Sequence, residues 1–320
     1  MELNPILFAT GGSFILSVIL GPLFIPLLRR LKFGQMIREE GPQSHLKKAG
    51  TPTMGGIIIL LAMTLAFLRF ADRTPEVYIL LVASLGFGLV GFLDDYIKIA
   101  LKRSMGLTPK QKLLGQFVFA AAVCALLFAN GHSTDVGIPG TGYTIPLGFL
   151  YYPFLILFML GMSNAVNFTD GLDGLLAGTS AIAFGALAVV AMTRTEPEAA
   201  FFSAAMIGAV LGFLVYNAHP AKVFMGDSGS LGIGGGLVAA AALAKAELLL
   251  LVIGGVFVIE VLSVIIQVVS FKTRGKRVFR MSPIHHHFEL SGWSEWRVVV
   301  SFWAAGLVLA GLGIYLNKGL

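Results

Sequence analysis

The chain has 320 residues, of which 56% are hydrophobic and 12% are charged. Soluble proteins average roughly 45–50% apolar and about 25% charged residues, so this composition excludes a water-soluble fold. The single cysteine, Cys124, excludes a disulfide framework, a thiolate zinc site and a paired redox motif. The net charge of +6 could indicate a nucleic-acid partner, so the positions of the charges decide its meaning.

Ten apolar runs are long enough, or nearly so, to cross the roughly 30 Å hydrocarbon layer of a bilayer, which takes about 17–25 helical residues. The sequence therefore predicts an all-α polytopic integral membrane protein with a single transmembrane domain over residues 1–320. We detect no soluble domain and no internal repeat. In chain order, the predicted spans are 6–28, 53–70, 77–93, 113–129, 149–166, 175–192, 199–216, 231–244, 248–271 and 298–316.

The charges around these spans predict an orientation. No Lys or Arg precedes the first run and Arg29 and Arg30 follow it, which indicates a retained span whose N-terminus faces outward. Ten spans return the C-terminus to the outside and place 18 of the 23 basic residues in loops on one side. Basic loops mark the cytoplasmic side, so the net charge needs no nucleic-acid partner. The outward loop 130–147 contains Gly and Pro between β-prone stretches and predicts a small hairpin.

Five of the seven aspartates fall on the predicted cytoplasmic side, in the motifs 92–98, 164–174 and 224–230. They are Asp94, Asp95, Asp170, Asp173 and Asp227. An ionised aspartate at mid-membrane costs about 3 kcal/mol, so these side chains are expected to meet water or cations. Carboxylate oxygens suit Mg²⁺, and the turn that enters the eighth span offers free N–H groups to an anion. The motifs together predict Mg²⁺ beside a phosphate.

Cationic side chains accompany the aspartates. Successive side chains of His285, His286 and His287 diverge in a helix or a strand, so one zinc ion is not expected, and we predict that they donate to phosphate. Basic residues suited to pyrophosphate or a lipid headgroup lie on the same side. These are Lys47, Lys48, Lys98, Lys102, Lys110 and Lys112.

Each of these features also has a purely structural interpretation. Adjacent aspartates at the end of a span are common interfacial charges, aspartates beside glycines cap helices, and lysines serve as topology signals. Asp170 and Asp173 would share one face only if their segment were helical. Glu260, inside the ninth span, is either a functional group or a buried hydrogen-bonded carboxyl. The Gly86-x-Gly88-x-x-Gly91 string lies inside a span and predicts close helix packing, not nucleotide binding.

Several strings, taken together, resemble a known family. They are Gly-Thr-Pro-Thr-Met-Gly-Gly at 50–56, Phe-Leu-Asp-Asp at 92–95, the segment 164–174, Phe-Met-Gly-Asp-Ser-Gly-Ser at 224–230, and Pro-Ile-His-His-His-Phe-Glu at 283–289. In order and over nearly the whole chain, they resemble the bacterial phospho-N-acetylmuramoyl-pentapeptide transferases. These belong to the polyprenyl-phosphate N-acetylhexosamine-1-phosphate transferases.

The resemblance implies an activity. Members transfer phospho-MurNAc-pentapeptide from UDP-MurNAc-pentapeptide to undecaprenyl phosphate, with Mg²⁺, releasing UMP and forming lipid I, the first lipid-linked peptidoglycan precursor. It also implies a ten-span homodimer in the bacterial inner membrane with a cytoplasmic active site. A sibling transferase that uses UDP-N-acetylglucosamine is one alternative. A cation-coupled transporter built on Glu260 and the glycine-broken spans is another.

The resemblance also assigns roles to residues. Asp227 resembles the metal-binding aspartate, and Asp170 is expected to bind the metal with it. Asp94 and Asp95 resemble the paired catalytic or lipid-phosphate-facing acids. Asp170 and Asp173 form the second acidic motif. The remaining matches are lysines Lys48, Lys98 and Lys110, the loop histidines His285, His286 and His287, Asn167 in the second motif, and Asn217 and Phe224 on the nucleotide side.

Overall fold

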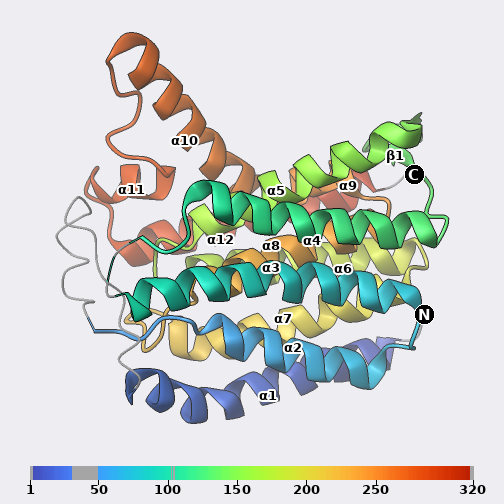
Figure 1. Cartoon of the computed structure of the whole chain (residues 1–320), viewed down its shortest axis with the longest axis horizontal. Coiled ribbons are helices and arrows are strands. Elements are labelled where there is room, and N and C mark those ends of the chain that lie inside the picture. The colour runs from blue at the N-terminus through green and yellow to red at the C-terminus, as the bar shows by residue number, and fades with distance from the viewer. Residues whose placement is uncertain (1–2, 31–49, 102, 104, 318–320) are drawn as a thin grey trace.

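The helices of the protein run alongside one another and form a bundle (Figure 1). The computed structural model describes residues 3–30, 50–101, 103 and 105–317. In chain order the helices are α1 (Leu3–Arg30), α2 (Gly56–Phe70), α3 (Pro75–Ala100), α4 (Pro109–Ala129), α5 (Tyr151–Thr169), α6 (Leu175–Thr193), α7 (Pro197–Asn217), α8 (Gly226–Leu243), α9 (Glu247–Ile253), α10 (Gly255–Arg274), α11 (Ile284–Glu289) and α12 (Glu295–Leu316). A short 3-10 helix, η2 (Gly148–Leu150), precedes α5.

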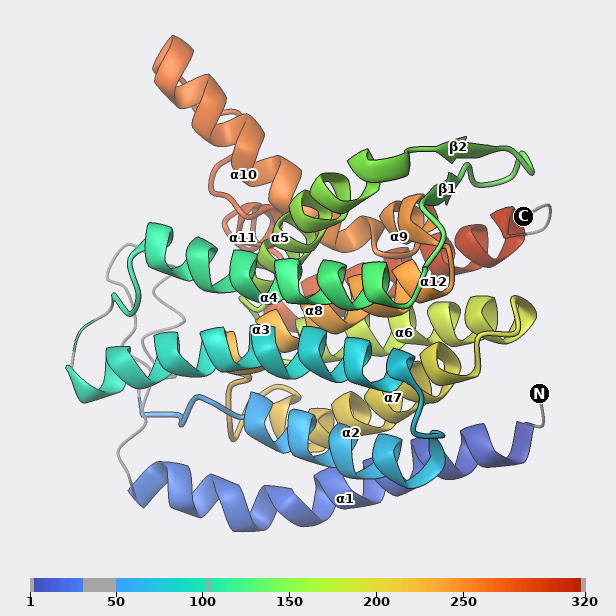
Figure 2. The same ribbon diagram turned by 45° about the vertical axis from the view of Figure 1, so that its right-hand side comes forward.

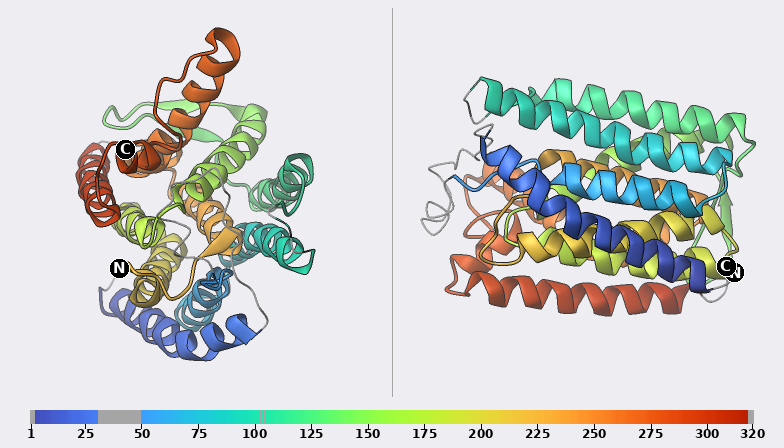
Figure 3. Two further views of the ribbon diagram at one scale, coloured as in Figure 1. Left: turned by 90° about the vertical axis from the view of Figure 1, so that its left-hand side faces the viewer. Right: turned by 90° about the horizontal axis from the view of Figure 1, so that it is seen from below.

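Each of the ten predicted spans contains helix, and the predicted helical, multi-pass architecture is confirmed. Within the described residues, eight helices are long and apolar enough to cross a membrane. The shorter α2 has 15 residues, and α8 begins with the polar run Gly-Asp-Ser-Gly-Ser. Helix α8 nevertheless lies in the interior of the bundle, where it packs on α3 and α5 (Figure 3).

The ninth predicted span is divided into two helices. Helix α9 ends at Ile253 and α10 begins at Gly255, so Gly254 separates them. From this break α10 leans away from the bundle (Figure 2). Its exposed side chains include Ile259, Leu262 and Ile266, an apolar surface of the kind that lipid covers.

The two ends of the bundle differ in character. Strands β1 (Asp135–Gly137) and β2 (Thr144–Pro146) pair antiparallel, with Val136 opposite Ile145, which confirms the predicted hairpin. Helix α1 begins and α12 ends at this hairpin end (Figure 3). The opposite end carries the last turns of α3 and α5 and the first turns of α4 and α8 (Figure 1). All the aspartate motifs therefore lie at this second end, which we call the acidic end.

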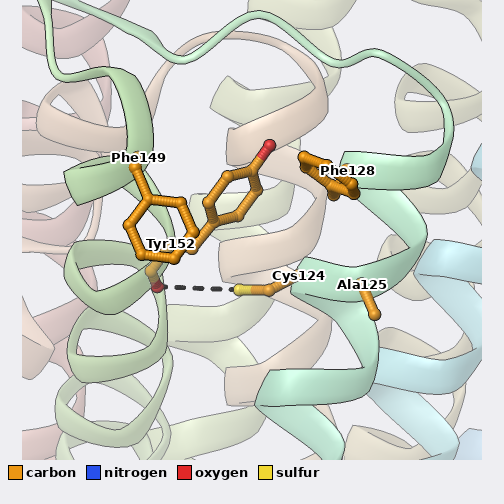
Figure 4. Close-up of a pocket in the computed structure, with 5 residues that line it drawn as sticks. All are labelled: Cys124, Ala125, Phe128, Phe149 and Tyr152. Atoms are coloured by element: carbon orange, nitrogen blue, oxygen red, sulfur yellow. Dashed lines mark hydrogen bonds between the residues drawn. The ribbon is translucent and has the colours of Figure 1, made fainter.

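A shallow, open apolar pocket lies on the surface toward the hairpin end, between α4 and α5. It has a volume of about 220 Å³ and is lined by Cys124, Ala125, Phe128, Phe149 and Tyr152 (Figure 4). The Cys124 thiol donates to the Tyr152 carbonyl oxygen at 3.7 Å. Cys124 follows Lys112 by twelve helical residues, or about 18 Å of rise, so this pocket is separate from the charged groups of the acidic end.

Glycines allow α3 to pack closely on its neighbours. A Cβ at Gly91 would overlap the backbone carbonyl oxygen of Asp227, and one at Gly88 would press on Leu60 of α2. A Cβ at Gly86 would overlap the ring of Phe119 in α4. The predicted packing face is confirmed, and its contact at Gly91 brings the start of α8 against the end of α3.

Replacement of Gly91 is expected to force α3 and α8 apart. We predict that Gly91→Ala destabilises the protein by about 1–3 kcal/mol, the usual cost of overpacking, and lowers the melting temperature measured in detergent. Gly161→Ala in α5 is the matched control, because a Cβ added there would make no contact within 4 Å. That variant should be as stable as the parent or slightly more so. Equal melting temperatures for the two variants would contradict this account of the packing.

Candidate active site

Three carboxylates converge at the acidic end. Asp94 and Asp95 lie near the end of α3, and Asp227 lies in the first turn of α8. One oxygen from each lies within 4.8 Å of the others, and Asp94 and Asp95 are each 3% exposed. We call these three residues the aspartate cluster. Such a set repels itself unless cations and hydrogen-bond donors stabilise it.

Two lysines provide the cations. The Lys98 Nζ lies 2.5 Å from Asp94 Oδ2, 2.9 Å from Asp227 Oδ2 and 3.6 Å from Asp95 Oδ1. The Lys112 Nζ lies 3.0 Å from the same Asp227 oxygen and donates to Asn167 Oδ1 at 3.2 Å. Two ammonium groups face three carboxylates, so the ionised cluster keeps an excess of negative charge that can attract a further cation.

Neutral donors fix the orientation of the carboxylates. The backbone N–H of Leu107 donates to Asp94 at 2.9 Å, and that of Ser228 donates to Asp95 at 3.0 Å. The Asn167 side-chain amide donates to Asp227 Oδ1 at 2.8 Å. Each acid of the cluster therefore has a donor besides lysine, which holds its oxygens in place.

Asp170 lies beside the aspartate cluster, in the turn that follows α5. Its Oδ2 accepts the backbone N–H of Gly226 at 3.2 Å. Burial raises the pKa of Asp170 to about 7, and the negative charges of Asp227 and Asp95 add to the effect. A divalent cation nearby would favour the ionised carboxylate and offset this penalty.

The donor set fits Mg²⁺. This ion prefers oxygen ligands and binds through one or two carboxylates plus water and phosphate oxygens. Asp94, Asp95 and Asp227 offer converging carboxylate oxygens, and Asp170 lies next to them. The family resemblance implied Asp227 and Asp170 as metal ligands, whereas in the structure Asp227 converges with Asp94 and Asp95.

Asp173 belongs to a second group. Its Oδ2 lies 3.1 Å from His219 Nδ1 and accepts the Ala221 backbone N–H at 3.0 Å. Glu295, at the start of α12, accepts the Asp173 backbone N–H at 2.9 Å and lies 3.4 Å from His219. Residues 170–174 form turns, not a helix, so Asp170 and Asp173 do not share the face that a helix would have given them.

Asn217 and Phe224, the two residues expected on the nucleotide side, form hydrogen bonds that connect neighbouring loops. The buried Asn217 accepts the Gly174 N–H at 3.0 Å and donates to the Val223 carbonyl at 3.0 Å. The backbone of Phe224 accepts the Gly55 N–H at 2.9 Å and donates to the Pro52 carbonyl at 2.8 Å. These bonds connect the 50–56 motif, the second acidic motif and the start of α8.

The three histidines have three different partners. His285 Nδ1 lies 3.0 Å from Glu260 Oε1, and His286 Nδ1 lies 2.7 Å from Glu289 Oε2. His287 Nδ1 accepts the Arg280 backbone N–H at 3.1 Å. These bonds show the divergence expected of consecutive side chains.

Of the two predicted active-site lysines that the structure describes, Lys98 lies at the aspartate cluster and Lys110 does not. Lys48 lies outside the described residues, and the side chain of Lys110 is exposed. Lys112 contacts both Asp227 and Asn167. From the sequence it was grouped with the other loop lysines, and no individual role was predicted for it. The helical phase of α4 distinguishes Lys110 from Lys112, but the sequence does not show which side of α4 is turned toward Asp227.

Comparison with known proteins identifies the family. Residues 77–245 match the family model described as glycosyl transferase family 4, and residues 48–60 match signature 1 of the phospho-N-acetylmuramoyl-pentapeptide-transferases. The chain is 59% identical to the phospho-N-acetylmuramoyl-pentapeptide-transferase of Bacillus subtilis (strain 168) over 316 residues, 98% of each chain. It is 60% identical to that of Geobacillus kaustophilus (strain HTA426) over 321 residues, 99% of each chain.

The chain belongs to the phospho-N-acetylmuramoyl-pentapeptide-transferase family. The predicted resemblance is thereby confirmed, and members of this family are phosphotransferase enzymes. The matched segment 77–245 contains the whole aspartate cluster together with Lys98 and Lys112. His285, His286, His287 and Glu260 lie beyond it.

The contacts predict unequal contributions from two lysines of this transferase. Lys112→Gln removes a cation 3.0 Å from Asp227 and should lower kcat/KM by about 100-fold, comparable to loss of a charge-stabilising group in other active sites. Lys110→Gln, the matched control two residues away, should change kcat/KM by less than about threefold, the range of a solvated charge. Steady-state kinetics on the two purified variants measures both values. A greater loss in Lys110→Gln would contradict the assignment of Lys112.

Proposed function

We propose that this protein transfers phospho-MurNAc-pentapeptide from UDP-MurNAc-pentapeptide to undecaprenyl phosphate, forming lipid I and releasing UMP. The observation that carries the proposal is the aspartate cluster with its two lysines, found in a chain of this family. The buried carboxylates and their excess negative charge match the requirements of a reaction between two phosphate-bearing substrates with a divalent cation.

Phosphoryl transfer depends on alignment of the reactants and on neutralisation of charge. Lys98 and Lys112 supply positive charge at the aspartate cluster, and Asn167 and the Ser228 backbone N–H hold two of its acids in place. We propose Asp94, Asp95, Asp227 and Asp170 as the residues that hold Mg²⁺. When bound, this ion supplies charge neutralisation for the diphosphate of the donor.

The acceptor demands little acid–base catalysis, because its nucleophile is already a phosphate oxygen. Besides holding the cation, Asp94 and Asp95 offer a carboxylate to the chemistry in one of two ways. In the first, one of them accepts the remaining proton of the lipid phosphate before direct attack on the donor. In the second, one carboxylate attacks the donor phosphorus, releases UMP and forms an acyl phosphate, which the lipid phosphate then attacks.

We propose that the acidic end faces the cytoplasm and that both termini face outward, in the bacterial inner membrane. The excess of basic loop residues on the side of the aspartate motifs supports this orientation. The position of the β1–β2 hairpin, with the start of α1 and the end of α12, at the other end of the bundle also supports it (Figure 3). A single transmembrane domain that works as a homodimer completes the proposal.

The alternatives have less support. The signature at 48–60 favours the muramoyl substrate over UDP-N-acetylglucosamine. A cation-coupled transporter is expected to hold its acids near mid-depth, where broken helices meet. Here the aspartates of the three motifs gather at one end of the bundle, and Glu260 pairs with His285.

The proposal is tested by UMP release from a panel of UDP-sugars in the presence of undecaprenyl phosphate and Mg²⁺. The parent protein should release UMP from UDP-MurNAc-pentapeptide and not from UDP-N-acetylglucosamine. Asp227→Asn should lower kcat by at least about 100-fold, because it removes one charge from the cation site and from Lys98 and Lys112.

Asp72→Asn is the matched control, because Asp72 is exposed and lies in the loop between α2 and α3, toward the hairpin end. It should retain the parent activity. Full activity of Asp227→Asn, or preference for UDP-N-acetylglucosamine, would refute the proposed function.

A further inference from the structure

A second polar contact joins α4 to α5, about one helical turn further into the bundle than Lys112. Gln116 follows Lys112 by four residues, so the two side chains share one face of α4. The side-chain amide of Asn164 in α5 donates to Gln116 Oε1 at 2.8 Å. Asn167 follows Asn164 on the same face of α5 and accepts the bond from Lys112. The two faces therefore meet through hydrogen bonds in successive turns.

Gln116 is the first side chain of α4 that the bundle buries. Within residues 109–119, all of which the structure describes, it is the one buried residue, and Ala120 is the next. The apolar side chains around it are exposed: Leu113, Leu114, Phe117 and Val118. The first turns of α4 thus have few contacts that determine how they lie against α5.

Polar and apolar contacts differ in how strongly they fix such a helix. Lipid chains are as apolar as leucine, so an exposed apolar side chain gains little by turning from lipid to protein. A buried amide has no water to replace a lost partner, so it resists any movement that breaks its hydrogen bond. Among the described residues Gln116 Nε2 has no partner, so this amide is a poor choice for packing alone. Its bond to Asn164 is what distinguishes it from an apolar residue.

The face of α5 that Gln116 meets is itself held to α8. Asn167 on this face donates to the Asp227 carboxylate at 2.8 Å. A contact between α4 and this face therefore also places α4 relative to α8. Lys112, one turn before Gln116, then lies 3.0 Å from Asp227 Oδ2.

We propose that Gln116 is a positioning residue for the transferase reaction. Its bond to Asn164 holds the first turns of α4 against α5 and thereby keeps the Lys112 ammonium group at Asp227. Gln116 itself touches neither substrate nor cation. This inference rests on the proposed function, because it gives Gln116 a role through the charge of Lys112.

Three variants of the full-length protein separate this role from packing. Gln116→Met keeps an unbranched side chain of similar length but removes the amide. The double variant Gln116→Asn with Asn164→Gln exchanges the two amides, keeps their combined length and restores a bond between them. Cys124→Ala is the matched control, because the Cys124 thiol also donates from α4 to α5, at the Tyr152 carbonyl oxygen (Figure 4). It lies about three helical turns from Lys112.

The first measurement is lysine labelling, which needs no substrate. The protein in bilayers is acetylated with N-hydroxysulfosuccinimide acetate, and mass spectrometry compares Lys112 with the exposed Lys110 of the same molecules. In the parent, ion pairing and partial burial protect Lys112. Gln116→Met should raise the relative modification of Lys112 by at least about threefold, because the first turns of α4 are released. Cys124→Ala and the exchanged pair should match the parent.

Lys98 provides an internal control for folding. It contacts the aspartate cluster from α3 and should keep the parent's degree of modification in Gln116→Met. An equal rise at Lys98 would mean that Gln116 supports the fold as a whole, and would overturn the proposal. Unchanged modification of Lys112, or failure of the exchanged pair to restore its protection, would also overturn it.

The second measurement is kinetic. Gln116→Met should lower kcat/KM by about three- to tenfold, the range of a hydrogen bond between membrane helices. In the Lys112→Gln background the same change should cost less than about twofold, because the residue through which Gln116 acts is absent. Cys124→Ala should stay within about twofold of the parent. Losses that multiply in the double variant would show that Gln116 does not act through Lys112 and would overturn the proposal.

Failure of the proposed function has a different signature. In that case the parent protein releases no UMP from UDP-MurNAc-pentapeptide, whereas the labelling of Lys112 still shows whether Gln116 holds it in place. The kinetic comparison then uses whichever UDP-sugar of the panel is active. The outcome at Gln116 is therefore read independently of the identity of the sugar.

Discussion

The close contact between α3 and α8 is the constraint on which the site depends. Gly91 leaves room for the Asp227 backbone, and Asp227 thereby reaches Asp94 and Asp95. Two unit charges about 4 Å apart interact by about 4 kcal/mol at the effective dielectric constant near a protein surface. The repulsion within the aspartate cluster therefore amounts to a large part of the stability of a typical domain. Lys98, Lys112 and the backbone donors make the arrangement possible.

The same contact connects structure to chemistry. In the resting protein, the carboxylates of the aspartate cluster and the ammonium groups of Lys98 and Lys112 neutralise one another. When substrates bind, the carboxylates are available to a cation and the ammonium groups to a diphosphate. Lys98 is one helical turn from Asp94 and contacts all three acids, so its ammonium group can shift among them without any movement of the backbone. This preorganisation suits a reaction in which the protein mainly aligns phosphates and compensates their charge.

Much of the fold could be predicted from the sequence, because long apolar runs and turn residues are local signals. The ten runs all contain helix, the 130–147 loop forms the expected hairpin, and the Gly86–Gly91 string packs against neighbouring helices. The break at Gly254 was not predicted. An apolar run that continues through a glycine gives no sign of where one helix ends and the next begins.

The gathering of the aspartates at one end also followed from the sequence, because apolar spans fix which loops share a side. Contacts between particular side chains could not be predicted in this way, because they depend on how each helix is rotated and how each turn folds. The sequence could not show that Lys112 faces Asp227 while Lys110 is exposed, or that Asp173 turns to His219 and Glu295. No partner of Glu260 could be predicted from the sequence, because His285 lies 25 residues further on, in a separate helix. Such pairings are tertiary, and only the packed structure reveals them.

The position of a bound divalent cation tests the account most directly. Mn²⁺ replaces Mg²⁺ at many oxygen-ligand sites and gives an anomalous X-ray signal, so crystals grown with Mn²⁺ locate the ion without an activity assay. The account predicts one strong anomalous peak within coordination distance of Asp227 and at least one of Asp94, Asp95 and Asp170. A peak between Asp173, His219 and Glu295, with none at Asp227, would contradict it.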